Sequence, residues 1–260
     1  MPELPDVEIY RQEAEKALGS VIESVEITDS GFKGIEKSSL EESLPGEKLK
    51  KTLRRGKYLF LETGKKQAVA MHFGMTGYLS LVENDSDPPK YVKCIFNLDN
   101  DHRLCYSSRR KLGKVEVTSD TDEYITRHDL GQDALELSEK EFLDMLEKSR
   151  SMIKSFLTDQ SIVAGVGNVY ADEILFQARI HPRSPTTGLT GAPAKNIYKQ
   201  MIRVLDIAID KKADVSKMPG TFLLPVRKEG EKCPRCGGKI EKIRISGRTG
   251  YHCPACQKEN

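Results

Sequence analysis

Apolar and polar residues alternate through the first half of the chain and predict β-strands there. Six segments show this period of two: residues 21–27, 57–61, 67–73, 91–98, 103–106 and 114–117. Asp99, Asn100 and Asp101 lie between two of these segments and predict a hairpin turn. Because the strands follow one another with short turns and no helix between them, we expect a β-sandwich or barrel.

Helical spacing appears at the amino terminus and again in the second half. Pro5 suits a first helical turn, and apolar residues on one helical face follow it: Val7, Ala14, Ala17 and Leu18. After a polar stretch at 118–122, interpreted as a loop, Ser138 and Glu141 carry the signature of a capping box. Three later helices are expected at 151–157, 169–178 and 194–211.

The change of pattern divides the chain into three parts. We expect an α+β protein with a β-sandwich domain over 1–125, a helical domain over 126–225 and a terminal metal-binding finger over 226–260. The helical pattern ends in a stretch rich in turn formers: Pro219, Gly220, Pro225 and Gly230.

The composition is that of a globular protein rather than a disordered or membrane-spanning one. The chain has 260 residues, 38% of them hydrophobic and 31% charged, and its net charge is 41 − 39 = +2. Its apolar runs fall short of the ~18 residues that cross a bilayer, so no membrane partner is expected. The start, MPELPDVEIY, does not resemble a secretory signal. We expect a cytoplasmic protein, or a nuclear one where the source has a nucleus.

The small net charge hides local asymmetry. Basic and acidic residues number six and one over 47–60, five and one over 101–114, and nine and four over 226–260. The acidic residues gather in three other segments: 36–42, 83–87 and 120–147. A single basic run is ordinarily a solvated surface, but three of them favour a polyanionic partner.

Four cysteines form two CxxC pairs near the end of the chain. They are separated by 16 residues and are Cys233, Cys236, Cys253 and Cys256. This spacing favours one tetrahedral Zn²⁺ with four thiolates, which leaves no ligand position open for catalysis. A redox dithiol and an iron–sulfur cluster are the alternatives. Cys94 and Cys105 lie in predicted strands and are interpreted as core residues.

Two turns are candidate phosphate sites. Gly165 and Gly167 lie where one helix should end and another begin, and this arrangement can leave amides free for a phosphate. Asn168 in that turn can cap the helix or donate to a phosphate. Arg248, flanked by two glycines, lies at the tip of a predicted hairpin. The alternatives are a plain helix connection and an exposed surface arginine.

Pro2 and Glu3 can carry chemistry of their own. A small second residue permits removal of the initiator Met1, which would expose Pro2 as a secondary amine with a pKa near ~8. Such an amine can attack a sugar C1′ and form an iminium that acts as an electron sink. Glu3 beside it can shuttle protons. Taken alone, Met-Pro starts carry no such meaning.

Five motifs, in the same order, resemble those of the formamidopyrimidine-DNA glycosylase / endonuclease VIII family of base-excision repair enzymes. They lie at 2–8, 55–59, 72–77, 165–171 and in the CxxC pairs with Arg248. The resemblance implies that Pro2 is the nucleophile on C1′ and that Glu3 is the general acid/base for opening the sugar. It also implies that Lys57 contacts a phosphate near the lesion and supports catalysis.

The resemblance also assigns residues that bind DNA. His72, Asn168 and Arg248 would grip the backbone and bend the duplex, and Met75 would enter the gap left by the flipped base. Arg110 aligns with the residue that faces the orphaned base. Leu112 stands where the family has a Phe wedge. The stretch 211–233, where the family has a loop that caps the lesion, is shorter than in typical 8-oxoguanine enzymes.

The resemblance implies a bifunctional DNA glycosylase and AP lyase that cleaves by β,δ-elimination. Leu4 and Pro5 match the branch that removes oxidised purines, so 8-oxoguanine and formamidopyrimidines are the first choice. Oxidised pyrimidines are the second, and a non-catalytic zinc-containing DNA-binding protein is the alternative of another class. The expected partner is duplex DNA with oxidised bases or AP sites, bound by a monomer.

Overall fold

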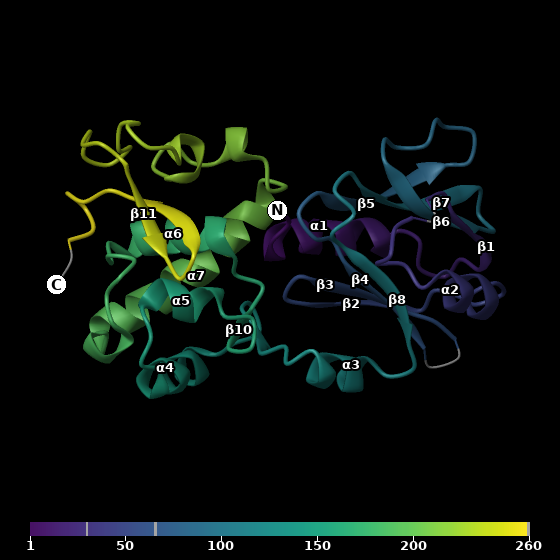
Figure 1. Ribbon diagram of the computed structural model, residues 1–260, viewed down its shortest axis with the longest axis horizontal. Helices are drawn as coiled ribbons and strands as arrows, with labels where there is room; N and C mark the ends of the chain where they lie inside the picture. The colour runs from purple at the N-terminus through teal and green to yellow at the C-terminus, as the bar shows by residue number, and fades with distance from the viewer. Residues whose placement is uncertain (30, 65–66, 259–260) are drawn as a thin grey trace. The chain divides into compact units, whose positions relative to one another are not determined.

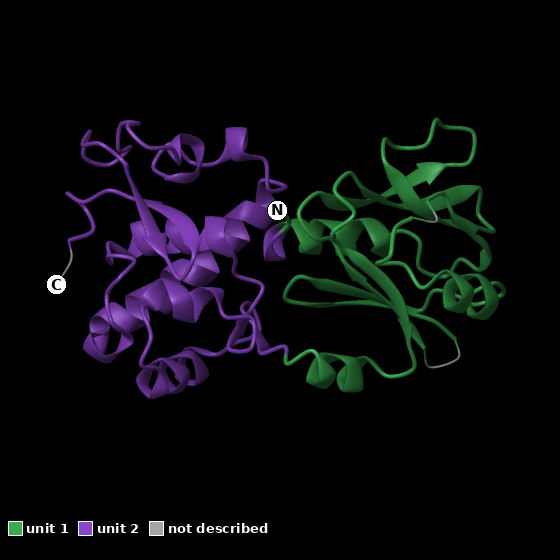
Figure 2. Ribbon diagram, viewed as in Figure 1, with its two compact units in different colours: residues 1–2, 6–129 green, residues 3–5, 130–260 purple. Residues whose placement is uncertain are grey.

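The computed structural model describes residues 1–29, 31–64 and 67–258 and forms two compact units. Figure 2 shows the first unit, residues 1–2 and 6–129, and the second, residues 3–5 and 130–260. Three residues at the start of the chain therefore belong with its second half.

The first unit is built on two antiparallel four-stranded sheets, labelled in Figure 1. One sheet has the order β1 (Ile22–Ile27), β6 (Val92–Leu98), β7 (His102–Ser108), β5 (Gly77–Glu83). The other has the order β2 (Lys51–Arg55), β3 (Tyr58–Glu62), β4 (Ala68–His72), β8 (Lys114–Thr118). One buried apolar cluster joins both sheets to α1 (Leu4–Glu15), with members such as Val7, Met71 and Phe96. The expected β-sandwich with an N-terminal helix is confirmed.

Two helices interrupt the strands, contrary to the expectation of strands joined only by short turns. α2 (Lys37–Ser43) follows β1 and buries only Leu40, so its sequence shows almost no apolar period. α3 (Thr121–Arg127) begins inside the stretch interpreted as a loop. Its N-cap is Asp120, whose carboxylate accepts hydrogen bonds from two backbone amides of the first turn. Because Asp at this position satisfies donors that have no helical partner, the polar stretch begins a helix.

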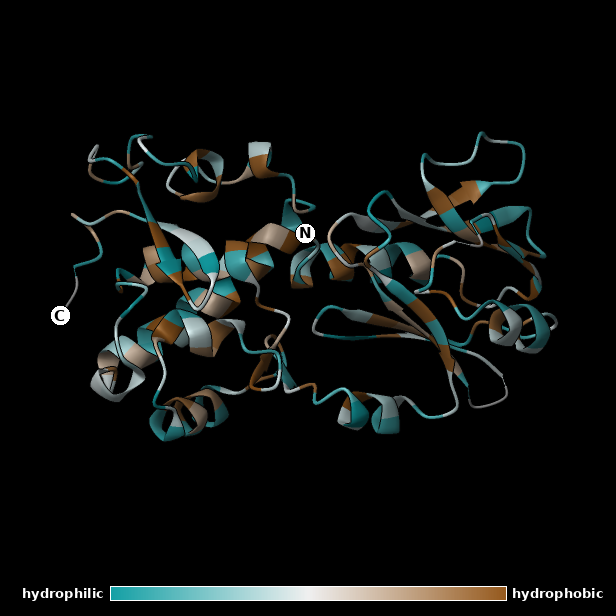
Figure 3. Cartoon of the chain, viewed as in Figure 1, coloured by the Kyte–Doolittle hydropathy of each residue, from teal (hydrophilic) through white to brown (hydrophobic). Residues whose placement is uncertain are grey.

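The second unit is mainly helical. Its helices are α4 (Glu139–Lys148), α5 (Ile153–Thr158), α6 (Asn168–Ala178) and α7 (Ala192–Asp210). Ser138 and Glu141 form the expected capping box in front of α4. Hydrophobic and hydrophilic residues interleave along α7, and the hydrophobic ones enter the core of the unit (Figure 3). Among the described residues, none of the helices combines the length and apolar character that a membrane crossing requires.

Short elements complete the second unit. β9 (Gln132–Asp133) and β10 (Val163–Ala164) form a parallel pair, and β11 (Glu241–Ile245) and β12 (Arg248–His252) form the expected terminal hairpin. A single turn of 3-10 helix, η1 (Thr186–Gly188), precedes α7. Two more, η2 (Val215–Lys217) and η3 (Leu224–Val226), follow it. The hairpin packs on α6 through a small apolar cluster that includes Phe176, Leu223 and Ile240.

Candidate active site and nucleic-acid interface

Glu3 is buried, and its carboxylate lies on the N-terminus of α6. Its side-chain oxygens accept hydrogen bonds from the amides of Gly167 at 2.9 Å, Val169 at 2.9 Å and Tyr170 at 3.2 Å. These are helix-end donors without an intrahelical partner, at the positive end of the helix dipole. A negative charge on Glu3 is therefore stabilised by the backbone, next in sequence to the half-buried Pro2.

The glycines of this turn make room for the amino-terminal segment. A Cβ on Gly167 would lie 2.3 Å from Glu3 Cδ, and one on Gly165 would lie 2.5 Å from Leu4 Cδ1. Gly165 also has a φ of +110°, which side chains disfavour. We expected this turn to leave its amides free for a phosphate. That expectation is wrong for the three amides that bind the Glu3 carboxylate.

Asn168 and Arg248 lie on neighbouring elements of the second unit. Asn168 Nδ2 donates to the carbonyl of Thr249 at 2.7 Å, which ties the first residue of α6 to β12. Asn168 does not cap the helix, because Gly167 holds the N-cap position. Arg248, the first residue of β12, is exposed, and its Nη1 donates to Thr158 Oγ1 at 2.8 Å. Two polar side chains of types that bind phosphate thus lie at the start of α6 and at the start of β12.

The four cysteines of the terminal module converge. Their sulfur atoms all lie within 4.8 Å of one another. Two separations, Cys233 to Cys256 at 3.8 Å and Cys236 to Cys253 at 3.6 Å, match the edge of about 3.8 Å of a tetrahedron with metal–sulfur bonds of ~2.3 Å. The donor set fits one structural Zn²⁺, held by the residues at the base of the β11–β12 hairpin.

In the first unit, two loops bring together three of the residues assigned by the sequence. A Cβ on Gly74 would lie 2.4 Å from the carbonyl carbon of Leu112, so the loop after β4 touches the loop before β8. The amide of Arg110 donates to Thr76 Oγ1 at 3.0 Å, which joins the same loops. Met75 and Leu112 are 40% and 53% exposed, which is unusual for large apolar side chains.

His72 ends β4 and is neutral at physiological pH. Burial, with help from the positive charges of Lys57 and Lys114, lowers the pKa of His72 to about 4. Its Nδ1 accepts from the amide of Gly74 at 3.3 Å, so Nε2 carries the proton and is the available donor. The structure thus provides His72 as an uncharged donor beside the half-buried Lys57.

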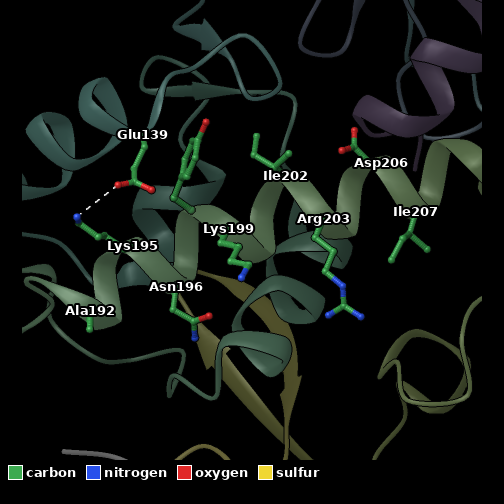
Figure 4. A pocket seen from close by; sticks show the side chains of 10 residues that line it. Glu139, Ala192, Lys195, Asn196, Lys199, Ile202, Arg203, Asp206 and Ile207 are labelled. Carbon is green, nitrogen blue, oxygen red and sulfur yellow. Dashed lines mark ion pairs between the residues drawn. The ribbon is translucent and has the colours of Figure 1, made fainter.

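A groove of about 750 Å³ runs along α7 in the second unit (Figure 4). Its lining includes Tyr198, Ile202 and Arg203, and Lys195 forms an ion pair with Glu139 there. The sequence assigns no chemistry to these residues.

Three segments of the chain match known domain models, and two of these models belong to one family. Residues 1–115 match the formamidopyrimidine-DNA glycosylase N-terminal domain, 130–219 the formamidopyrimidine-DNA glycosylase H2TH domain, and 230–258 a zinc finger found in FPG and IleRS. The chain belongs to the formamidopyrimidine-DNA glycosylase family. Its three matched domains appear in the order that the sequence motifs indicate.

Relatives and solved structures of this family extend over the full chain. The formamidopyrimidine-DNA glycosylase of Pelotomaculum thermopropionicum is 35% identical over 99% of this chain and 99% of its own. A Lactococcus lactis Fpg bound to DNA with an abasic site aligns with a TM-score of 0.85 and 32% identity, over 99% of this chain and 100% of that one. A MutM complex with DNA containing carbocyclic 8-oxo-G aligns with a TM-score of 0.86 and 33% identity, at the same coverage.

The sequence analysis did not identify two buried acidic residues in α6, Asp172 and Glu173. Asp172 is fully buried and binds Lys154 and Arg227 at 2.6 Å each. Glu173 is also fully buried, and burial raises its pKa to about 7. The signal was present as two adjacent acids within an otherwise apolar run over 169–176, since buried charges need partners.

Replacement of Gly167 tests the seating of Glu3. In Gly167→Ala the new methyl group displaces the Glu3 carboxylate and leaves buried amides without an acceptor, at a cost of about 1–3 kcal/mol. Urea unfolding measures the change. Gly188→Ala is the matched control, because nothing lies within 4 Å of its Cβ position. Equal unfolding midpoints for the two variants would contradict the proposed seating.

The titration of His72 gives a second test. Because its pKa in the folded protein, about 4, lies below the ~6.5 of an unfolded chain, the unfolded state binds more protons between these values. The stability contribution of neutral His72 is therefore complete above pH ~6.5 and is lost as the pH falls toward 4. We expect ring proton shifts in NMR that stay constant from pH 8 to pH 5.5. A midpoint near 6.5 would show that the ring is not buried as described.

Proposed function

We propose that this family member acts on oxidised purines in duplex DNA, with Pro2 as the nucleophile. As a formamidopyrimidine-DNA glycosylase family protein it is a base-excision repair DNA glycosylase and AP lyase. The observation that carries the proposal is the Glu3 carboxylate, held by three backbone amides directly after the residue that would attack.

The proposed chemistry begins at the Pro2 nitrogen after removal of Met1. Its lone pair forms a bond to C1′ of the damaged nucleotide, and the bond from C1′ to the base breaks. The proton of the attacking nitrogen passes to Glu3, which begins as a carboxylate, and from there to the sugar O4′ as the ring opens. The resulting iminium withdraws electrons and makes the C2′ proton acidic. Loss of that proton to water expels the 3′ phosphate by β-elimination, and loss of the C4′ proton to water then expels the 5′ phosphate by δ-elimination.

Residues of both units take part in the proposed DNA binding. Lys57 and Arg248 supply positive charge to backbone phosphates, and Asn168 and neutral His72 supply hydrogen bonds. Met75 and Leu112 are exposed apolar side chains that fill the space left by a flipped nucleotide, and Arg110, on the loop of Leu112, faces the orphaned base. The zinc ion contributes structure, since its four thiolates hold the hairpin that carries Arg248.

A second lesion class is supported by the segment after α7. Phe222 and Leu223 are buried, the amide of Leu224 donates to Glu173 at 2.8 Å, and Gln177 donates to the carbonyl of Thr221 at 3.1 Å. A segment fastened in this way does not form a free loop over a base, which favours smaller oxidised pyrimidines. A solved Lactococcus lactis relative was captured with DNA containing an oxidised pyrimidine.

The remaining expectations complete the proposal. We propose a catalytic β-sandwich domain over 1–125, a helical domain over 126–225 and a zinc finger over 226–260. The protein acts as a monomer, in the compartment that holds the chromosome. A non-catalytic DNA-binding role is the alternative, and it would leave Pro2 without a covalent function.

Borohydride trapping tests the nucleophile. With an AP-site duplex the protein should form a covalent adduct that maps to Pro2 by peptide mass spectrometry. Pro2→Gly should reduce the trapping rate by on the order of 10²-fold or more, because the secondary amine is lost. Pro88→Gly, in an exposed loop, is the control and should trap like the unaltered protein. An adduct on another residue, or trapping by protein that retains Met1, would contradict the assignment.

Lesion exchange in one duplex tests the substrate. We expect kcat/KM for 8-oxoguanine to exceed that for dihydrouracil or 5-hydroxyuracil by about tenfold or more. The reverse order would contradict the proposed preference and place the protein with the enzymes for oxidised pyrimidines.

A further inference from the structure

Asp172 is the centre of a buried charge cluster in the second unit. It lies in α6 with a side chain that is 0% exposed. Its Oδ1 binds Lys154 Nζ of α5 at 2.6 Å, and its Oδ2 binds the Arg227 guanidinium through Nη2 at 2.6 Å and Nε at 2.9 Å. Oδ2 also accepts from the amide of Tyr251 in β12 at 3.0 Å. One carboxylate thus connects α5, α6, the segment after η3 and the hairpin.

The hairpin is shaped to meet this cluster. Gly250 lies opposite it, and a Cβ there would come within 2.2 Å of Lys154 Nζ and 2.8 Å of Asp172 Oδ1. The Arg227 guanidinium also stacks on the Tyr251 ring, with 4.9 Å from its carbon to the ring centroid. Gly250 therefore allows β12 to lie close to Asp172 and Lys154, and the contacts of the cluster fix the distance between β12 and these residues.

The residues assigned to phosphate lie at the margin of this contact. Arg248 is three residues before Tyr251 on β12, and it donates to Thr158 Oγ1. The same Thr158 hydroxyl donates to the carbonyl of Lys154 at 2.9 Å, one helical turn away. Asn168 is one turn before Asp172 on α6 and binds the Thr249 carbonyl. A shift of the hairpin at Asp172 would move Arg248 relative to Asn168.

We propose that Asp172 is a positioning residue for DNA binding: through Arg227 and the Tyr251 amide it sets the hairpin on α5 and α6, so that Arg248 and Asn168 grip the phosphodiester backbone together. Asp172 is buried and does not touch the DNA itself. The inference rests on the proposed function, which assigns phosphate contacts to Arg248 and Asn168.

A double-mutant cycle on Arg227 and Arg248 tests the proposal. Arg227→Gln removes one arm of the cluster and leaves the Lys154–Asp172 pair balanced in charge. With a duplex containing a tetrahydrofuran abasic analogue, we expect it to weaken affinity by roughly tenfold and to reduce the slope of log K against log salt by about 0.9, as for one lost phosphate contact. In an Arg248→Ala background the same change should cost less than about twofold.

A second variant changes the hairpin side of the same contact. Gly250→Ala keeps every charge but pushes β12 away, and it should reproduce the loss of affinity and of salt slope. Gly188→Ala is the control and should bind as the unaltered protein does. Zinc content, measured after denaturation, should remain at one ion per chain in all variants, which separates a shifted hairpin from a lost one.

Several results would overturn the inference. Additive effects in the cycle would mean that Arg227 acts independently of Arg248, and an unchanged salt slope in both variants would mean that the hairpin has not moved. At saturating DNA, Arg227→Gln and Gly250→Ala should keep the kcat for AP-site cleavage and raise only KM, because the hydrogen bonds of Glu3 are untouched. Failure of the unaltered protein to trap DNA with borohydride would instead refute the proposed function.

Discussion

The hydrogen bonds between the Glu3 carboxylate and the first amides of α6 are the constraint on which the candidate site depends. They join residues that are 164 to 167 positions apart in the sequence. An amino terminus is ordinarily the least ordered part of a chain. Here a helix N-terminus holds it, because a buried carboxylate is stable only where donors replace water. The reactivity assigned to Pro2 therefore relies on the helical half of the protein.

This constraint explains why the turn before α6 contains glycines. The segment must approach Glu3 and Leu4 more closely than any side chain permits, and Gly165 must also adopt a positive φ. The same helix end can neutralise either a phosphate or a carboxylate, and in this fold the carboxylate occupies it. These three amides are therefore not available to a phosphate, and the phosphate contacts that we propose, Lys57 and Arg248, are side chains.

The parts of the fold that follow from local pattern could be predicted, and the parts that depend on distant partners could not. Alternation located β1 and β6, and the capping box located the start of α4. β2 was missed because Arg54 occupies a buried position in it, where Glu8 of α1 pairs with it at 2.9 Å. Asp172 likewise has the residue type of a surface position. The motifs identified the candidate residues. The tautomer of His72 and the hydrogen bonds of Glu3 could be determined only from the three-dimensional structure.

Zinc and Asp172 constrain the hairpin in different ways. The four cysteines fix the module internally, since all of their sulfurs lie at the base of the hairpin. A metal bound there cannot determine how the strands face α5 and α6, because Arg248 lies at the opposite end of β12. That orientation comes from the contacts of Tyr251, Thr249 and Arg248 with the helices. The position of Arg248, which we propose as a phosphate contact, therefore depends on both the metal site and the buried carboxylate.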